Sequence, residues 1–245
     1  MQIKHYFLIL AALHATNAIA QDMSAKEALV DANIRSIFYH ELGHAEISEM
    51  NVTIFGQEED AADVMSVLLI DALYEEEAAQ ALAYDSAFGF INDPEGTEEI
   101  AYWSTHGPDE QRYYNHVCLF YGANPDERDD LAVELGLPQD RAEYCPEEFD
   151  QANSSWSLIF DEMEVAENAG KLVYEYEGSA PNGLLDRIMQ QEVSDMNDTL
   201  SLPRDVGVVV LSCGEANAYY DPQKIEIQFC EEFIPHLETI WEKLQ

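Results

Sequence analysis

The sequence His40-Glu41-Leu42-Gly43-His44 has the residue types and the spacing that bind a metal ion and put it to chemical use. On a helix, residues four apart lie on one face about one turn apart, so both imidazoles can reach a single ion. Glu41 projects to nearly the same side and can act on a water molecule without ligating the metal. The pattern therefore predicts metal-assisted hydrolysis with Glu41 as the general base.

The surrounding residues predict that this motif lies within a long helix. Ser24 and Glu27 form a capping-box pattern, and good helix formers follow them. Residues 51–56 predict a break, and residues 58–84 predict a second long helix. The second helix begins with the acidic sequence EEDAAD at residues 58–63, which by itself is typical of a first turn that complements the helix dipole.

Together with the H-E-x-x-H helix, this acidic stretch resembles the gluzincin group of zinc peptidases. In that group the third metal ligand is a glutamate on the next helix, often within E-x-x-A-D. The resemblance implies that His40, His44 and Glu59 bind Zn²⁺. It also implies that Asp63, one turn further on, holds one of the histidines through its other ring nitrogen. Glu58 is the alternative third ligand.

The end of the chain carries a second element that resembles gluzincins. Residues 206–211 predict a buried strand, and residues 215–229 predict a β-hairpin. Within it, Asn217-Ala218-Tyr219 resembles the N-A-[FY] strand that pairs with extended substrate ahead of the metal helix in that group. Here the hairpin follows the metal helix. The resemblance therefore implies a circularly permuted arrangement in which Asn217 and Ala218 bind substrate. An ordinary hairpin stapled by a disulfide is the alternative.

Several polar residues are candidates to stabilise the negative oxygen that forms during hydrolysis. They are His106, Arg112, Tyr113 and Tyr219. The first three belong to a segment, residues 98–120, that we expect to be mostly helical. For each residue taken singly, a structural role is the alternative.

Four blocks of the chain together resemble a bacterial family classed as predicted metallopeptidases. The blocks are residues 38–44, 58–63, 111–115 and 213–230, and the resemblance extends over most of the chain. It implies a metallopeptidase with a peptide or protein substrate.

The charge of the chain excludes some classes of partner. There are 49 acidic and 11 basic residues, which give a net charge of −38. Because phosphate binding needs a basic face, we expect no nucleic-acid partner. We interpret the acidic surface as a solvated one suited to solubility or a salty environment, with attraction of cationic substrates as the alternative.

The N-terminus predicts export from the cytoplasm. A short polar region with Lys4 is followed by an apolar run at residues 6–13, and Ala18-Ile19-Ala20 is typical of a cleavage site. Residues 1–20 are thus a predicted signal peptide, cleaved after Ala20, and the mature protein is secreted or periplasmic. No later segment has the roughly 20 continuous apolar residues of a membrane helix, so we expect no membrane insertion.

The four cysteines fit an oxidising compartment. Four cysteines allow three pairings, and sequence alone does not choose between them. We favour the nearest-neighbour pairing, Cys118 with Cys145 and Cys213 with Cys230. A structural zinc site of four thiolates is the alternative, and the lack of any C-x-x-C pair counts against it.

These observations predict one domain over residues 21–245, of the α+β class. We expect a mainly helical, zincin-like domain with a small sheet that includes the C-terminal hairpin. The predicted function is that of a secreted or periplasmic zinc metalloendopeptidase. The alternatives are a non-catalytic metal-binding or interaction protein on a peptidase scaffold, and an acidic salt-adapted protein with a chance H-E-x-x-H. The sequence indicates no oligomeric state.

Overall fold

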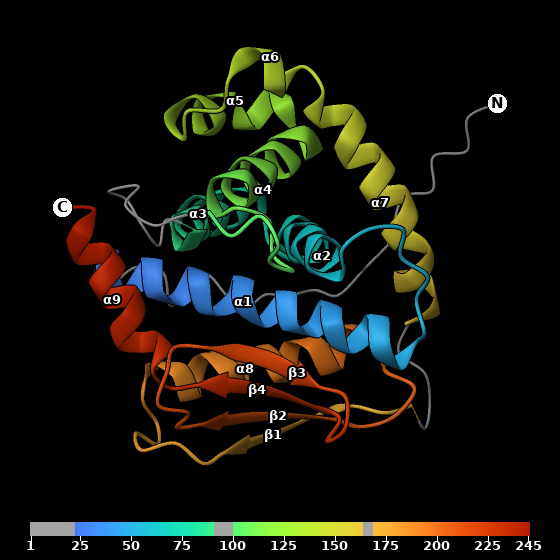
Figure 1. Cartoon of the computed structure of the whole chain (residues 1–245), viewed down its shortest axis with the longest axis vertical. Coiled ribbons are helices and arrows are strands. Elements are labelled where there is room, and N and C mark those ends of the chain that lie inside the picture. The colour runs from blue at the N-terminus through green and yellow to red at the C-terminus, as the bar shows by residue number, and fades with distance from the viewer. Residues whose placement is uncertain (1–22, 91–99, 164–168) are drawn as a thin grey trace.

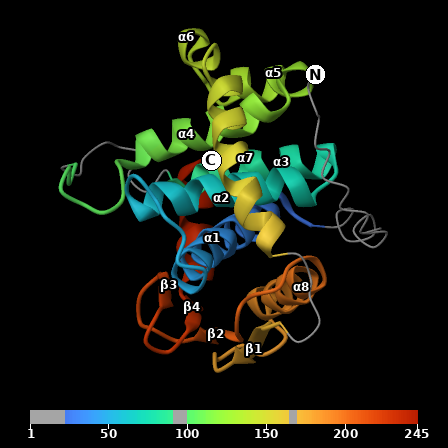
Figure 2. The same cartoon turned by 90° about the vertical axis from the view of Figure 1, so that its right-hand side faces the viewer.

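A long central helix organises the molecule. The computed structural model of the chain describes residues 23–90, 100–163 and 169–245, so the predicted signal peptide lies outside the described residues. Helix α1 (Ala25–Glu49) runs between a layer of helices and a small sheet, as Figures 1 and 2 show. A mainly helical chain with a small mixed sheet confirms the predicted α+β class. Within the described ranges, no helix is long and apolar enough to cross a membrane.

The other elements fall on the two sides of α1. The helical side contains α2 (Glu58–Leu73), α3 (Glu76–Ala87), η2 (Phe88–Phe90), α4 (Asp109–Ala123), α5 (Pro125–Glu134), α6 (Gln139–Ala142) and α7 (Cys145–Glu162). The sheet side contains β1 (Leu172–Tyr176), α8 (Leu184–Thr199), β2 (Val206–Leu211), β3 (Ala218–Asp221) and β4 (Glu226–Cys230), with α9 (Phe233–Lys243) following β4.

Helix α1 begins and ends where its sequence dictates. The predicted capping box is present, because the Ser24 hydroxyl accepts from the Glu27 amide while the Glu27 carboxylate accepts from the Ser24 amide. At the other end, Asn51 takes a left-handed backbone with φ of 53°, and Val52 N–H donates to Ile47 C=O at 3.0 Å. The helix therefore ends at Glu49, and the chain turns before α2 begins at Glu58.

The prediction of one long helix over residues 58–84 is wrong in one respect, because these residues belong to two helices, α2 and α3. The chain breaks at Tyr74, which is extended with φ of −111° and ψ of 144°. The Tyr74 hydroxyl lies 2.8 Å from that of Tyr39 on α1, and Tyr39 donates to Glu192 on α8 at 2.5 Å. A buried polar cluster needs all its partners in place, so tertiary contacts override local helix propensity at this residue.

The sheet has the strand order β1-β2-β4-β3. Strands β1, β2 and β4 are parallel, and β3 pairs antiparallel with β4, so β3 is an edge strand. Strand β3 contacts helix α1. The Tyr220 hydroxyl on β3 donates to Glu49 on α1 at 2.6 Å. The predicted hairpin therefore lies directly beside the metal-motif helix. Strand β1 was not predicted.

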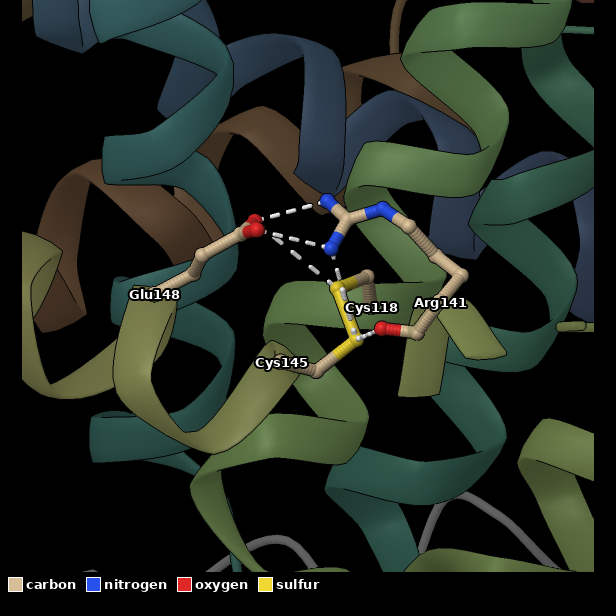
Figure 3. The surroundings of a disulfide bond; sticks show 4 residues. All are labelled: Cys118, Arg141, Cys145 and Glu148. Carbon is tan, nitrogen blue, oxygen red and sulfur yellow. Dashed lines mark hydrogen bonds and ion pairs between the residues drawn. A yellow bond between two sulfur atoms is a disulfide. The ribbon is translucent and has the colours of Figure 1, made fainter. Parts of the chain in front are cut away.

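Two disulfides cross-link the chain, one on the helical side and one in the sheet. Cys118 on α4 bonds Cys145 at the start of α7, and Cys213 bonds Cys230 at the end of β4, which is the nearest-neighbour pairing. Figure 3 shows the first of these bonds beside the ion pair between Arg141 and Glu148. Each bond joins segments that meet only in the folded chain.

Candidate metal centre and active site

Three donor atoms from two helices converge at one point. His40 Nε2 and His44 Nε2 on α1 are 3.1 Å apart, and Glu59 Oε2 in the first turn of α2 lies 3.2 Å from each of them. In a tetrahedral zinc site with metal–ligand distances of about 2.0–2.1 Å, neighbouring donors are about 3.3 Å apart. Two imidazole nitrogens and a carboxylate oxygen in this triangle therefore fit a divalent metal ion.

Close packing of α1 and α2 brings Glu59 to the histidines. Gly43, inside the H-E-x-x-H motif, has no side chain, and a Cβ there would lie 3.1 Å from Ala62 Cα on α2. Ala62 is fully buried at this contact. The two helices therefore approach each other closely through small residues. It places the start of α2 within reach of the imidazole tips.

Each histidine has its own carboxylate on the ring nitrogen away from the donor triangle. His44 Nδ1 lies 2.8 Å from Glu58 Oε1. His40 Nδ1 lies 2.8 Å from Asp63 Oδ1, in a contact that is not aligned as a full hydrogen bond. A carboxylate at Nδ1 favours the tautomer that leaves Nε2 free to bind a metal. Glu58 thus contacts a histidine on the side away from the triangle, and Glu59 is the carboxylate that completes the donor triangle.

The electrostatics of this cluster favour a cation. Burial opposes positive charge on His40, but the contacts with Asp63 and Glu59 outweigh it and raise the His40 pKa to about 9. Burial also opposes negative charge on Glu59, and the three surrounding imidazoles, His106 foremost, outweigh it and lower the Glu59 pKa. Protons occupy the site when no metal competes, and a bound metal ion would release them.

Glu41 lies in the wall of the same cavity as the two histidines. Its side chain is buried. Burial raises the Glu41 pKa, while the neighbouring imidazole charges of His40 and His44 oppose that rise. A carboxylate with a raised pKa beside a metal site suits general-base chemistry.

His106 reaches the donor triangle from the segment before α4. The predicted helix over residues 98–120 begins only at Asp109, so His106 lies in the non-helical segment at residues 100–108. Its Nε2 is 2.8 Å from Glu59 Oε2, and its ring stacks on that of His40 at a centroid distance of 6.1 Å. The structure therefore brings this predicted site residue to the metal centre.

Arg112 and Tyr113 lie further from the donor triangle. Arg112 donates from Nε and Nη2 to the two oxygens of Asp63, both at 2.8 Å. It stands behind Asp63, which in turn contacts His40, and this favours a positioning role over the predicted oxyanion role. The Tyr113 hydroxyl donates to Leu135 C=O at 2.9 Å, a structural contact.

Strand β3 divides its predicted site residues between two faces. Side chains alternate along a strand, and Tyr220 faces α1 through its bond to Glu49. Tyr219 therefore faces the opposite side, where its hydroxyl donates to Gln228 at 2.6 Å. This bond holds the Tyr219 hydroxyl at β4, while Tyr219 is still among the residues that line the cavity with His40 and His44. Tyr220 was not predicted, and only the position of the strand relative to α1 reveals it.

One cavity of about 1400 Å³ contains the metal centre and the edge strand. One face of α1 forms a wall of it, and the turn after the helix adds Asn51. The residues of α1 in this wall are Asn33, Ser36, Ile37, His40, Glu41, His44, Ile47 and Ser48. From Asn33 to Ser48 this face is about 23 Å long at 1.5 Å per residue. Asn217, Ala218, Tyr219 and Tyr220 also line the cavity. The donor triangle lies near the middle of its length.

Comparison with known sequences gives a family but no individual relative. A search of curated proteins and a search of solved structures gave no significant match. The sequence model of one family matches residues 5–160 and 180–245, which include all three donors of the triangle and the edge strand. The chain therefore belongs to the DUF4344 family, whose description is "putative metallopeptidase".

Proposed function

We propose that the protein is a secreted or periplasmic zinc metalloendopeptidase. Membership of a metallopeptidase family implies a metal ion and peptide substrates. The observation that carries the proposal is the triangle of His40 Nε2, His44 Nε2 and Glu59 Oε2, with Glu41 in the same cavity wall. Three protein donors leave a fourth position open, as in catalytic zinc sites.

The residues around the triangle divide the work of hydrolysis. A zinc ion bound there would lower the pKa of a water molecule to about 7 and polarise the scissile carbonyl. Glu41 takes the proton from the attacking water and passes it to the leaving amine. His106 donates from Nε2 to the carbonyl oxygen as negative charge builds on it. Asp63 and Glu58 hold the two ligand histidines in orientation.

The free edge of β3 supplies the substrate-binding surface. Asn217 C=O accepts from Cys230 N–H, so the backbone groups of Asn217 point toward β4. By the alternation of an antiparallel strand, those of Ala218 and Tyr220 point to the free edge. An extended peptide can pair with that edge and present its carbonyl to the metal centre. The wall of α1 continues on both sides of the histidines, which favours cleavage within a chain.

This arrangement supports a gluzincin-like site with a permuted order of elements. In the gluzincin pattern the N-A-[FY] strand precedes the metal helix, whereas here β3 follows α1 by more than half of the chain. The same two elements still lie side by side. Asn217→Ala should therefore raise KM or lower turnover while folding is retained, and an unchanged kcat/KM on peptide would remove β3 from the substrate site.

Two variants test the metal and the base separately. Elemental analysis of the purified protein should give one zinc per chain, and His40→Ala should lose it. Glu41→Gln should keep zinc and abolish the chelator-sensitive digestion of a peptide library. Full activity of Glu41→Gln would falsify the proposed mechanism.

A second candidate is a non-catalytic metal-binding protein on the same scaffold. The position of His106 favours it, because a fourth protein donor close to Glu59 could close the coordination as in structural zinc sites. Metal-loaded protein that cleaves nothing in the peptide library would support this candidate. Cleavage that requires Glu41 would reject it.

Export is the remaining part of the proposal. Two disulfides are compatible with an extracellular protein, and the predicted signal peptide ends at Ala20. Protein recovered from outside the cytoplasm should begin at Gln21 when its N-terminus is sequenced. An N-terminus that retains residues 1–20 would contradict cleavage at this site.

A further inference from the structure

His106 lies close enough to the donor triangle to bind the metal ion itself. Its Nε2 is 2.8 Å from Glu59 Oε2, the same oxygen that lies 3.2 Å from His40 Nε2 and His44 Nε2. One carboxylate oxygen is thus surrounded by three imidazole nitrogens. Ligand atoms of His40, Glu59 and His106 all lie within 4.8 Å of one another, a group that could hold a metal ion by itself.

We propose that His106 is a fourth metal ligand, which closes the coordination of the centre while no substrate is bound. The donor set is then three imidazoles and one carboxylate, which is a full tetrahedral complement for zinc. The inference rests on the metal-binding part of the proposed function and is independent of peptide hydrolysis.

The chain around His106 allows the small movement that ligation needs. Donor atoms around one zinc ion lie about 3.3 Å apart. The group of His40, Glu59 and His106 is held only within 4.8 Å and does not include His44, so the His106 ring must move closer to the other donors to ligate. The His106 side chain is 43% exposed, so no packed core restrains its ring. It is followed by Gly107, at which a Cβ would have no neighbour closer than 3.8 Å, and then by Pro108 at the start of α4. The exposure of the ring therefore leaves room for it to shift.

The same nitrogen can serve two successive roles. With no substrate present, Nε2 fills the fourth position and keeps a reactive metal centre closed. A peptide that enters along β3 competes for that position, and the displaced imidazole remains beside the carbonyl oxygen, where the proposed function needs a donor. Trp103, 82% exposed on the same segment, lines the cavity and is available to contact that peptide.

The test uses the full chain loaded with zinc or with cobalt(II), and compares His106→Ala with His236→Ala. His236 lines the same cavity from α9 but is outside the donor cluster, so it is a matched control. X-ray absorption of the zinc protein should count three imidazoles in the unmodified chain and in His236→Ala, and two in His106→Ala. Zinc affinity, measured by chelator competition, should fall about 100-fold or more in His106→Ala, because loss of an outer partner alone costs 10–100-fold.

A small metal-binding probe gives a second readout. Acetohydroxamate should bind the cobalt(II) form of His106→Ala more tightly than the unmodified protein, because it need not displace an imidazole. Two imidazoles in the unmodified protein, with zinc affinity unchanged in His106→Ala, would overturn the proposal and leave His106 as a partner of Glu59. Three imidazoles without any peptidase activity would sustain the proposal while rejecting the proposed function.

Discussion

Arg112 should control both the stability of the metal-free protein and its affinity for zinc. The guanidinium holds both oxygens of Asp63 at 2.8 Å, and Asp63 contacts His40 Nδ1. Arg112→Met keeps much of the side chain's length and removes the charge and both hydrogen bonds. Asp63 then keeps its contact with His40 Nδ1 but loses both hydrogen bonds from the guanidinium.

The expected magnitude follows from the burial of the pair. The Arg112 and Asp63 side chains are 17% and 21% exposed. Removing one partner of a fully buried pair costs about 3–5 kcal/mol, because the other charge stays behind without compensation. Since about a fifth of each side chain meets solvent, we expect Arg112→Met to lower the free energy of unfolding by about 2–3 kcal/mol. Looser positioning of His40 should weaken zinc binding about 10–100-fold.

The assay combines urea unfolding of the metal-free protein with chelator competition for zinc. Arg141→Met is the matched control, because Arg141 also forms a two-bond pair, with Glu148, in a more exposed position (Figure 3). That control should cost less than about 1 kcal/mol and leave zinc affinity unchanged. Adding Asp63→Asn to Arg112→Met should recover part of the lost stability. If Arg112→Met behaves like Arg141→Met in both measurements, the reasoning about Asp63 is wrong.

Three further predictions concern other contacts. Glu58→Gln weakens the 2.8 Å contact with His44, so zinc affinity by chelator competition should fall about 10-fold; an unchanged affinity would refute this orienting role. Tyr220→Phe removes the 2.6 Å hydrogen bond that ties β3, the proposed substrate-binding strand, to Glu49 on α1. KM for peptide should therefore rise while zinc content stays at one per chain. Burial raises the pKa of Asp85 to about 6, so the folded state holds this proton more tightly than the unfolded state. Stability should therefore fall by about 1 kcal/mol, after solvent screening, as pH rises from about 4 to 6. Thermal unfolding of Asp85→Asn should lack this fall.

Local patterns predicted the parts of the site that lie on one element. The capping box at Ser24 and the run of helix formers after it correctly predicted α1. The four-residue spacing put His40 and His44 on one face of it, because helix geometry follows from short-range hydrogen bonds. The hairpin predicted over residues 215–229 likewise corresponds to β3 and β4, since both strands are neighbours in sequence.

Local sequence patterns did not predict contacts between segments that are far apart in the chain. Residues 58–84 have the pattern of one helix. The chain breaks at Tyr74 because the Tyr74 hydroxyl joins a buried polar cluster on α1 and α8. Strand β1 has five residues, and its pairing with β2 is a long-range contact. Arg112 reached the site as a candidate by its type alone, and its partner Asp63 was not foreseen.

The sequence alone therefore determined helix α1 and the placing of His40, Glu41 and His44 along it, because those relations span less than two turns of one helix. Tertiary structure decided what surrounds them: Glu59 and His106 at one oxygen, Arg112 behind Asp63, and β3 beside α1. It also decided that Tyr220 and not Tyr219 faces the central helix. A strand presents alternate residues to opposite faces, and only its packing against α1 fixes which face is which.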